Sequence, residues 1–185
     1  IFVSDIDKRK RRELELENRA EHDALTGLIN RQTASLLLPE MLDEATTSDS
    51  TSAFVIIDLD DFKTINDQYG HLSGDTVLSG VGEHLRTAFR KNDLVCRWGG
   101  DEFVAYCNDL SRSDIVERME ALCGKPWTAV VGTAEIKLTF SAGIALIPDD
   151  GIEFETIYQR ADRALYQAKA EGKAMFRFYD RPPRT

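Results

Sequence analysis

Arg97-Trp98-Gly99-Gly100-Asp101-Glu102-Phe103 lies near the middle of the chain and sets the expected architecture around it. Apolar, β-prone residues flank it at 94–96 and 103–107, so the segment predicts a β-hairpin with a short glycine-containing loop. Glycine tolerates positive φ and leaves the backbone bare, while two acids project from the hairpin tip. Such a tip suits a phosphate-bound divalent cation, although glycine and aspartate are also common in ordinary solvated turns.

A loop closed by Gly99 and Glu102 sets the expected register of this hairpin. Cys96 would then face Ala105, so it would not lie opposite Cys107 across the two strands. The chain has 3 cysteines and no CxxC pair, and we interpret all of them as free core thiols in a reducing compartment.

A second acidic segment follows a continuous apolar run at 53–57, which predicts a strand buried on both faces. The run ends in Asp58-Leu59-Asp60-Asp61, and in an extended chain Asp58 and Asp60 share a face. Acids at a strand end can simply be solubilising residues. Beside a second acidic tip they also fit as ligands of Mg²⁺ or Mn²⁺, which accept hard oxygen donors and keep some waters.

Two helices should follow, a short one from residue 62 and a long amphipathic one that ends near residue 89. Asn66 lies on the first and Asp75 near the start of the second. Asn66 fits a turn, and the helix dipole favours Asp75 whatever its function. An amide and a carboxylate on two facing helices would also match the edge of guanine, whose ring N–H and exocyclic amine both donate to a carboxylate. Adenine offers no such pair of donors.

The remaining elements are expected from apolar spacing and turn residues. Helices are predicted at 31–44, 113–122 and 153–170, and strands at 128–131, 135–147 and 176–179. Asn30 is the expected N-cap of the first of these helices. Lys169 and Lys173 lie near the end of the last helix, where lysines are electrostatically ordinary but could also reach back to bound phosphates.

Composition limits the class of protein. The chain has 185 residues, 42% of them hydrophobic, which is enough for one α/β domain with a short appended segment. A net charge of −9 argues against a nucleic-acid surface and fits a protein that meets polyphosphate through a few placed cations and metal ions. No run approaches the length of a membrane span and no signal peptide is visible, so we expect a cytoplasmic domain. The first residue is Ile1 rather than Met, so we expect the chain to be part of a longer parent protein. That parent protein could be either soluble or membrane-associated.

The order of motifs along the chain resembles that of a GGDEF domain, the diguanylate cyclase family. The matching segments are 23–31, 58–63, 66–67, 70–71, 74–75, 99–103, 161–166 and 168–169. Over residues 22–180 the resemblance implies an α/β (α+β) fold of the palm-like nucleotide-cyclase type. Its central, mostly antiparallel sheet would be flanked by helices, with a protruding hairpin at the active site. Residues 1–21 resemble the end of a PAS-type sensor with its linker helix, and 181–185 would be a C-terminal tail.

The resemblance implies a reaction that joins two GTP molecules into cyclic di-GMP and two pyrophosphates, with two Mg²⁺ or Mn²⁺ ions per half-site. The implied metal ligands are Asp58, Asp101, Glu102 and the backbone carbonyl of Leu59. Asp101 also matches the general base, with Glu102 beside it, and Lys63 matches the cation that steadies phosphoryl charge. The implied substrate contacts are Phe62, Asn66, His71, Asp75, Gly99, Gly100, Lys169 and Lys173.

Arg90-Lys91-Asn92-Asp93 matches the RxxD product-inhibition site of the family, with Arg90 and Asp93 as its ends. The arginine would hold phosphate or guanine, and the aspartate would accept from the base. RxxD alone is a common pattern, and its fixed place just before the hairpin is what makes it specific. One departure from the family is Gly172-Lys173-Ala174, where Gly-Arg-Asn is usual.

Each domain of this family holds one GTP, so the resemblance implies a homodimer whose two domains face each other. An upstream sensor would act through the N-terminal helix, and no nucleic-acid partner is expected. A catalytically silent cyclic di-GMP receptor using the RxxD residues is the alternative, and the complete set of hairpin acids with Lys63 argues against it. A single-nucleotide cyclase of related fold would have no use for the RxxD site.

Overall fold

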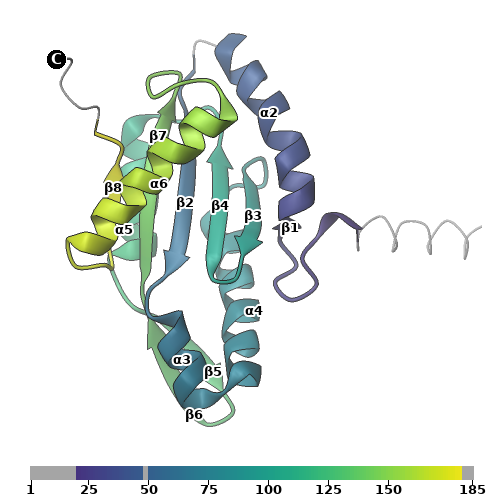
Figure 1. The fold of residues 1–185 in the computed structure, drawn as a ribbon, viewed down its shortest axis with the longest axis vertical. Helices are drawn as coiled ribbons and strands as arrows, with labels where there is room; N and C mark the ends of the chain where they lie inside the picture. The colour runs from purple at the N-terminus through teal and green to yellow at the C-terminus, as the bar shows by residue number, and fades with distance from the viewer. Residues whose placement is uncertain (1–19, 48–49, 181–185) are drawn as a thin grey trace, which may run out of the picture.

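The computed structural model describes residues 20–47 and 50–180 (Figure 1). The expected sensor end and linker helix at 1–21 lie outside these ranges except for residues 20 and 21, and the expected tail at 181–185 lies wholly outside them. None of the helices in the described ranges is both long and apolar enough to cross a bilayer.

A six-stranded sheet forms the centre of the structure. The described residues form eight strands, six of them in this sheet: β1 (Ile29–Asn30), β2 (Ser52–Leu59), β3 (Leu94–Gly99), β4 (Glu102–Cys107), β5 (Trp127–Val131), β6 (Ala134–Leu138), β7 (Phe140–Ile147) and β8 (Phe176–Phe178). The helices are α2 (Arg31–Thr47), α3 (Phe62–Tyr69), α4 (His71–Ala88), α5 (Arg112–Cys123) and α6 (Phe154–Ala170). The central order is β1-β3-β4-β2-β7-β8, and β5 pairs with β6 in a separate sheet. β2 is antiparallel to β4 and β7, and β3 to β4, so the predicted mostly antiparallel sheet flanked by helices is confirmed.

Alternate residues of β2 divide the core between two faces of the sheet. Val55 and Ile57 pack with residues of α3, α4 and α5 on one face. Phe54 and Ile56 pack with residues of α2 and α6 on the other, and Figure 1 shows α6 crossing in front of β7. Because both faces are covered, β2 needs apolar residues at successive positions, as the run at 53–57 predicts.

The expected single strand at 135–147 is wrong, because two strands occupy that run. β6 pairs with β5 and β7 pairs with β2, with the change of sheet at Thr139. The Thr139 carbonyl accepts the Asp60 N–H at 2.9 Å, and its hydroxyl donates to the Asp60 carboxylate at 2.6 Å. Asp60, the residue directly after β2, therefore fixes Thr139 as the point between β6 and β7 where the chain passes from one sheet to the other.

The expected hairpin register is also wrong, by one residue. Gly99 does pair with Glu102, but Arg97 pairs with Phe103 and Trp98 is passed over in a β-bulge, which leaves Cys96 opposite Val104. Directly opposite residues share a face of a sheet. Trp98 and Phe103 belong to cores on opposite faces, so one extra residue on β3 is required to bury both.

The contact between α6 and β7 depends on Gly143, and we predict that Gly143→Ala destabilises the fold. A Cβ at this position would lie 2.1 Å from the Ala161 carbonyl oxygen and 2.2 Å from the Leu165 nitrogen, both backbone atoms of α6. The helix would have to move away, at a cost of about 1–3 kcal/mol in the free energy of unfolding measured by denaturant titration. Gly99→Ala is the matched control because a Cβ there meets nothing within 4 Å. Equal stability of the two variants would contradict this account.

Candidate functional site

The acids at the end of β2 and at the hairpin tip meet because β2 pairs with β4. Asp58 lies directly opposite Glu102 in the antiparallel register, and the Leu59 N–H donates to the Asp101 carbonyl at 3.2 Å. The structure thus brings Asp58, Leu59, Asp101 and Glu102 together, as the sequence predicts. Their role as metal ligands stays a prediction.

Two side chains of α6 reach these acids. The Lys169 ammonium lies 2.8 Å from Asp58 Oδ1, and the Tyr158 hydroxyl donates to Glu102 Oε1 at 3.0 Å. Burial raises the pKa of Tyr158 to about 12 and the Glu102 carboxylate contributes to the shift, so the hydroxyl keeps its proton and remains a donor. Helix α6 therefore supplies both a cation and a neutral donor to the acidic end of the sheet.

Negative charge is concentrated in a partly dry site. Burial raises the pKa of Asp58, the Lys169 contact opposes this, and the charges of Asp101 and Asp60 raise it further. Burial also raises the pKa of Glu102, with a smaller contribution of the same sign from Asp58, while the hydrogen bond from Tyr158 opposes it. Both shifts indicate a place where a bound cation would relieve electrostatic repulsion.

The donor set fits a hard divalent cation that shares its ligands with a substrate. Across the described residues, no group of three or more His, Cys, Asp or Glu side chains is already assembled as a metal cage. Carboxylates with one backbone carbonyl form an open oxygen set, which suits Mg²⁺ because it usually keeps waters and takes other ligands from phosphates. The Lys169 ammonium on Asp58 shows that this carboxylate already attracts a cation.

The predicted base-reading pair lies side by side on α3 and α4. A Cβ at Gly74 would fall 1.9 Å from the Asn66 Oδ1, so only glycine lets the amide lie against α4 next to Asp75. Asp75 and His71 are exposed there. Phe62 is only 8% exposed and belongs to the core, so it lies beneath this pair rather than open to a ligand.

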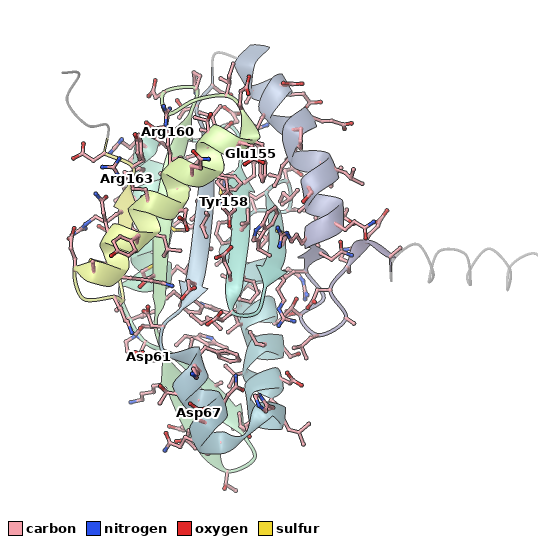
Figure 2. All side chains as sticks on the ribbon, viewed as in Figure 1. Asp61, Asp67, Glu155, Tyr158, Arg160 and Arg163 are labelled. Carbon is pink, nitrogen blue, oxygen red and sulfur yellow. The ribbon has the colours of Figure 1, made fainter. Side chains whose placement is uncertain are left out.

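The other predicted phosphate-contact residues surround the acids. Lys63 is exposed on α3, and the Lys173 ammonium lies 2.6 Å from Asp61, which precedes α3 (Figure 2). Gly99 and Gly100 are exposed at the hairpin tip, where Gly100 has a φ of 57°. Three lysines, at 63, 169 and 173, therefore come from segments that flank the same strand end.

Asp60, which the sequence pairs with Asp58 as a candidate metal ligand, is instead a buried structural residue. Its carboxylate accepts the hydroxyl of Thr139 at 2.6 Å, the hydroxyl of Ser141 at 2.7 Å and the N–H of Ala174 at 3.0 Å. These bonds tie the end of β2 to β7 and to the loop after α6. Polar Thr139 and Ser141 within the otherwise apolar run at 138–147 were the available signal.

The RxxD residues are joined by an arginine that sequence reasoning missed. Asp93 accepts the Arg90 backbone N–H at 2.8 Å and the Arg118 guanidinium at 2.5 Å, and its side chain is 3% exposed. Asp93 is therefore committed to holding Arg118 and is not open toward a base. Arg90, Arg118, Lys125 and His84 line a pocket of about 490 Å³ between α4 and α5.

Comparison with known proteins identifies one family. Residues 20–175 match the family model described as diguanylate cyclase, GGDEF domain. The chain is similar to the response regulator PleD of Caulobacter vibrioides, with 36% identity over 177 residues, 90% of this chain and 39% of PleD. It is also similar to the diguanylate cyclase DgcM of Escherichia coli, with 37% identity over 178 residues, 93% of this chain and 42% of DgcM. It therefore spans less than half the length of these two curated relatives.

A solved structure supports the same relationship. The chain resembles the GGDEF domain of PA1120 (TpbB or YfiN) from Pseudomonas aeruginosa, with a TM-score of 0.80 and 32% identity. The match covers 86% of this chain and 94% of that one. The similarity thus extends over nearly the whole of that separate domain.

The loop after α6 generates a prediction about stability. Ala174 has a φ of 49°, a left-handed conformation that alanine adopts at a cost and asparagine tolerates. We expect Ala174→Asn to raise the free energy of unfolding by about 1 kcal/mol, since its N–H can still donate to Asp60. Ala121→Asn, on the exposed side of α5, should lower stability slightly because asparagine is a poorer helix former. A lower free energy of unfolding for Ala174→Asn than for the wild type would contradict the inferred backbone strain at this position.

Proposed function

Because this chain belongs to the GGDEF domain family of diguanylate cyclases, we propose that it joins two GTP molecules into cyclic di-GMP and releases two pyrophosphates. The observation that carries the proposal is the pairing of Asp58 with Glu102 across β2 and β4, with Asp101 and the Leu59 backbone beside them. This arrangement gathers oxygen donors at one strand end, where the lysines that flank it can hold a triphosphate. Two bonds form, each joining the 3′-oxygen of one nucleotide to the α-phosphorus of the other, and at each α-phosphorus the bond to pyrophosphate breaks.

Asp58, Asp101, Glu102 and the Leu59 carbonyl would hold two Mg²⁺ or Mn²⁺ ions per half-site, which when bound lower the pKa of the attacking hydroxyl and stabilise the leaving group. Lys63 neutralises charge that develops on the phosphoryl oxygens. Lys169 and Lys173 exchange their present carboxylate partners for the β- and γ-phosphates. Asp101, with Glu102 beside it, accepts the proton of the 3′-hydroxyl.

Asn66 and Asp75 select guanine. The carboxylate accepts from the ring N–H and the exocyclic amine, and the amide, held against Gly74, completes the recognition of the base edge. His71 at the start of α4 lies at the same corner. Adenine would leave the Asp75 carboxylate without its donors, so GTP is the proposed substrate.

The reaction needs two copies of the domain. Each copy has one Asn66–Asp75 pair and one acidic strand end, so it can bind one GTP. The α-phosphates of two GTP molecules therefore meet only when two copies face each other in a homodimer. The curated relatives extend well beyond the segment that matches this chain, which supports an upstream sensor in the full-length protein. The silent-receptor alternative is not favoured, because Asp58, Asp101 and Glu102 are all present and assembled.

Cyclic di-GMP inhibits the enzyme through the pocket between α4 and α5. Arg90 is exposed there, and Asp93 orients Arg118 toward the same space through their 2.5 Å contact. The exposed Arg90 guanidinium can hold a phosphate or the acceptor edge of guanine in a bidentate manner, and Arg118, with one nitrogen bound to Asp93, adds a second positive charge. Asp93 serves as the residue that positions Arg118.

The cyclase proposal is tested by Glu102→Gln. The amide keeps the size of the side chain and an oxygen for Tyr158, but it lacks the charge needed to hold a cation. Turnover of GTP to cyclic di-GMP should fall by about 100-fold or more, since even outer partners of metal ligands change activity 10–100-fold. Glu155→Gln, an exposed residue at the start of α6, is the matched control and should be silent. Retained turnover in Glu102→Gln would contradict the proposed site.

The inhibition proposal is tested by Arg90→Ala. Loss of a charged hydrogen bond of 1.5–3 kcal/mol should raise the cyclic di-GMP concentration for half-inhibition by about 10-fold or more. Lys91→Ala removes an exposed positive charge from the next residue, so it controls for long-range electrostatics. Equal effects of the two substitutions would show that a general charge, and not a specific Arg90 contact, governs inhibition.

A further inference from the structure

Tyr158 contacts the acidic strand end, and none of the predicted roles includes it. Its hydroxyl donates to Glu102 Oε1 at 3.0 Å, and in the part of the chain that the structure describes no other side chain is hydrogen-bonded to Glu102. Lys169, eleven positions later on α6, lies on the same side of the helix and contacts Asp58. One face of α6 therefore contacts both Asp58 and Glu102, the two acids that lie opposite each other on β2 and β4.

The Tyr158 ring is fixed by other aromatic rings. Its centroid lies 5.6 Å from that of Trp98, 5.9 Å from Phe154 and 6.2 Å from Phe54. Aromatic rings at such separations pack favourably and lose little conformational freedom. Figure 2 labels Tyr158 on α6 beside β2 and β4. The hydroxyl is thus aimed at Glu102 by packing that also buries the bulged residue of β3.

A neutral donor has a different effect on a carboxylate from that of a lysine. The Lys169 ammonium compensates the charge of Asp58 and competes with any other cation there. The Tyr158 hydroxyl uses a lone pair of one Glu102 oxygen and restricts rotation of the side chain, but it leaves the charge in place. The second oxygen remains oriented and available. A hydrogen bond of this kind holds a ligating carboxylate in one orientation before the metal arrives.

We propose that Tyr158 is a positioning residue that holds the Glu102 carboxylate in the orientation in which it binds a divalent cation. The inference rests on the metal site of the proposed function. It assigns no chemical step to Tyr158. Removal of the hydroxyl alone should weaken cation binding, because Glu102 would then lose rotational freedom only when the ion binds.

The test measures Mn²⁺ binding to the purified protein by the loss of the free-ion electron paramagnetic resonance signal. Tyr158→Phe keeps the ring and removes only the hydroxyl, and it should raise the dissociation constant for Mn²⁺ by about 10-fold. Tyr106→Phe is the matched control, because the Tyr106 hydroxyl donates to the Met41 carbonyl away from the acids. It should leave Mn²⁺ affinity unchanged.

A double-mutant cycle separates positioning from a general structural effect. In a Glu102→Gln background, Tyr158→Phe should weaken Mn²⁺ binding no further, since the residue it positions is gone. Wild-type Mn²⁺ affinity in the single Tyr158→Phe variant would overturn the proposal, and so would an equal loss in both backgrounds. Assay of cyclic di-GMP synthesis by the wild type keeps the two questions apart. If the wild type makes cyclic di-GMP and Tyr158→Phe binds Mn²⁺ as tightly as the wild type, the positioning role is wrong and the proposed cyclase activity stands. If the wild type makes no cyclic di-GMP but Tyr158→Phe weakens Mn²⁺ binding only when Glu102 is present, the positioning role is supported and the cyclase activity is not.

Discussion

β2 and β4 run antiparallel side by side, and the acids of the site take their positions from that pairing. Their register sets Asp58 opposite Glu102 and brings the Leu59 N–H to the Asp101 carbonyl. A sheet buried on both faces holds such a register firmly, because a slip of one residue would move apolar side chains to the wrong face. The backbone positions of the acids are therefore as rigid as the core beneath them, and the orientation of each carboxylate is left to its side-chain partners.

The surrounding elements adapt to this strand end. Buried Asp60 ties it to β7 and to the loop after α6 through three hydrogen bonds from its neighbours. Gly143 lets α6 lie directly on the sheet, which brings Tyr158 and Lys169 within reach of the acids. From this one helix, Lys169 compensates the charge of Asp58 and Tyr158 satisfies an oxygen of Glu102, in a cluster of negative charge that burial makes costly.

Local patterns were enough to predict much of this arrangement. Residues close in sequence determine the buried strand at 53–57, the glycine-containing hairpin and the amphipathic helices. Asn30 is an example, since its side chain accepts the Thr33 N–H at 2.9 Å and caps α2 as predicted. The acids predicted to hold a metal and the pair predicted to read a base were selected by the order of motifs along the chain.

What escaped prediction depends on contacts between distant residues. The bulge at Trp98 follows from which face of the sheet each neighbour is buried on, and a hairpin sequence alone does not contain that information. Arg118 reaches Asp93 across 25 residues and Tyr158 reaches Glu102 across 56. Such partners become visible only when the helices that carry them are placed on the sheet.

The most direct test of the central claim is to incubate the purified protein with GTP and Mg²⁺ over a range of protein concentrations and to resolve the products by chromatography. The account predicts cyclic di-GMP, formed at a rate that rises more steeply than linearly with protein concentration, because two domains must meet. Absence of product at every concentration, together with tight binding of added cyclic di-GMP, would contradict it and identify a receptor.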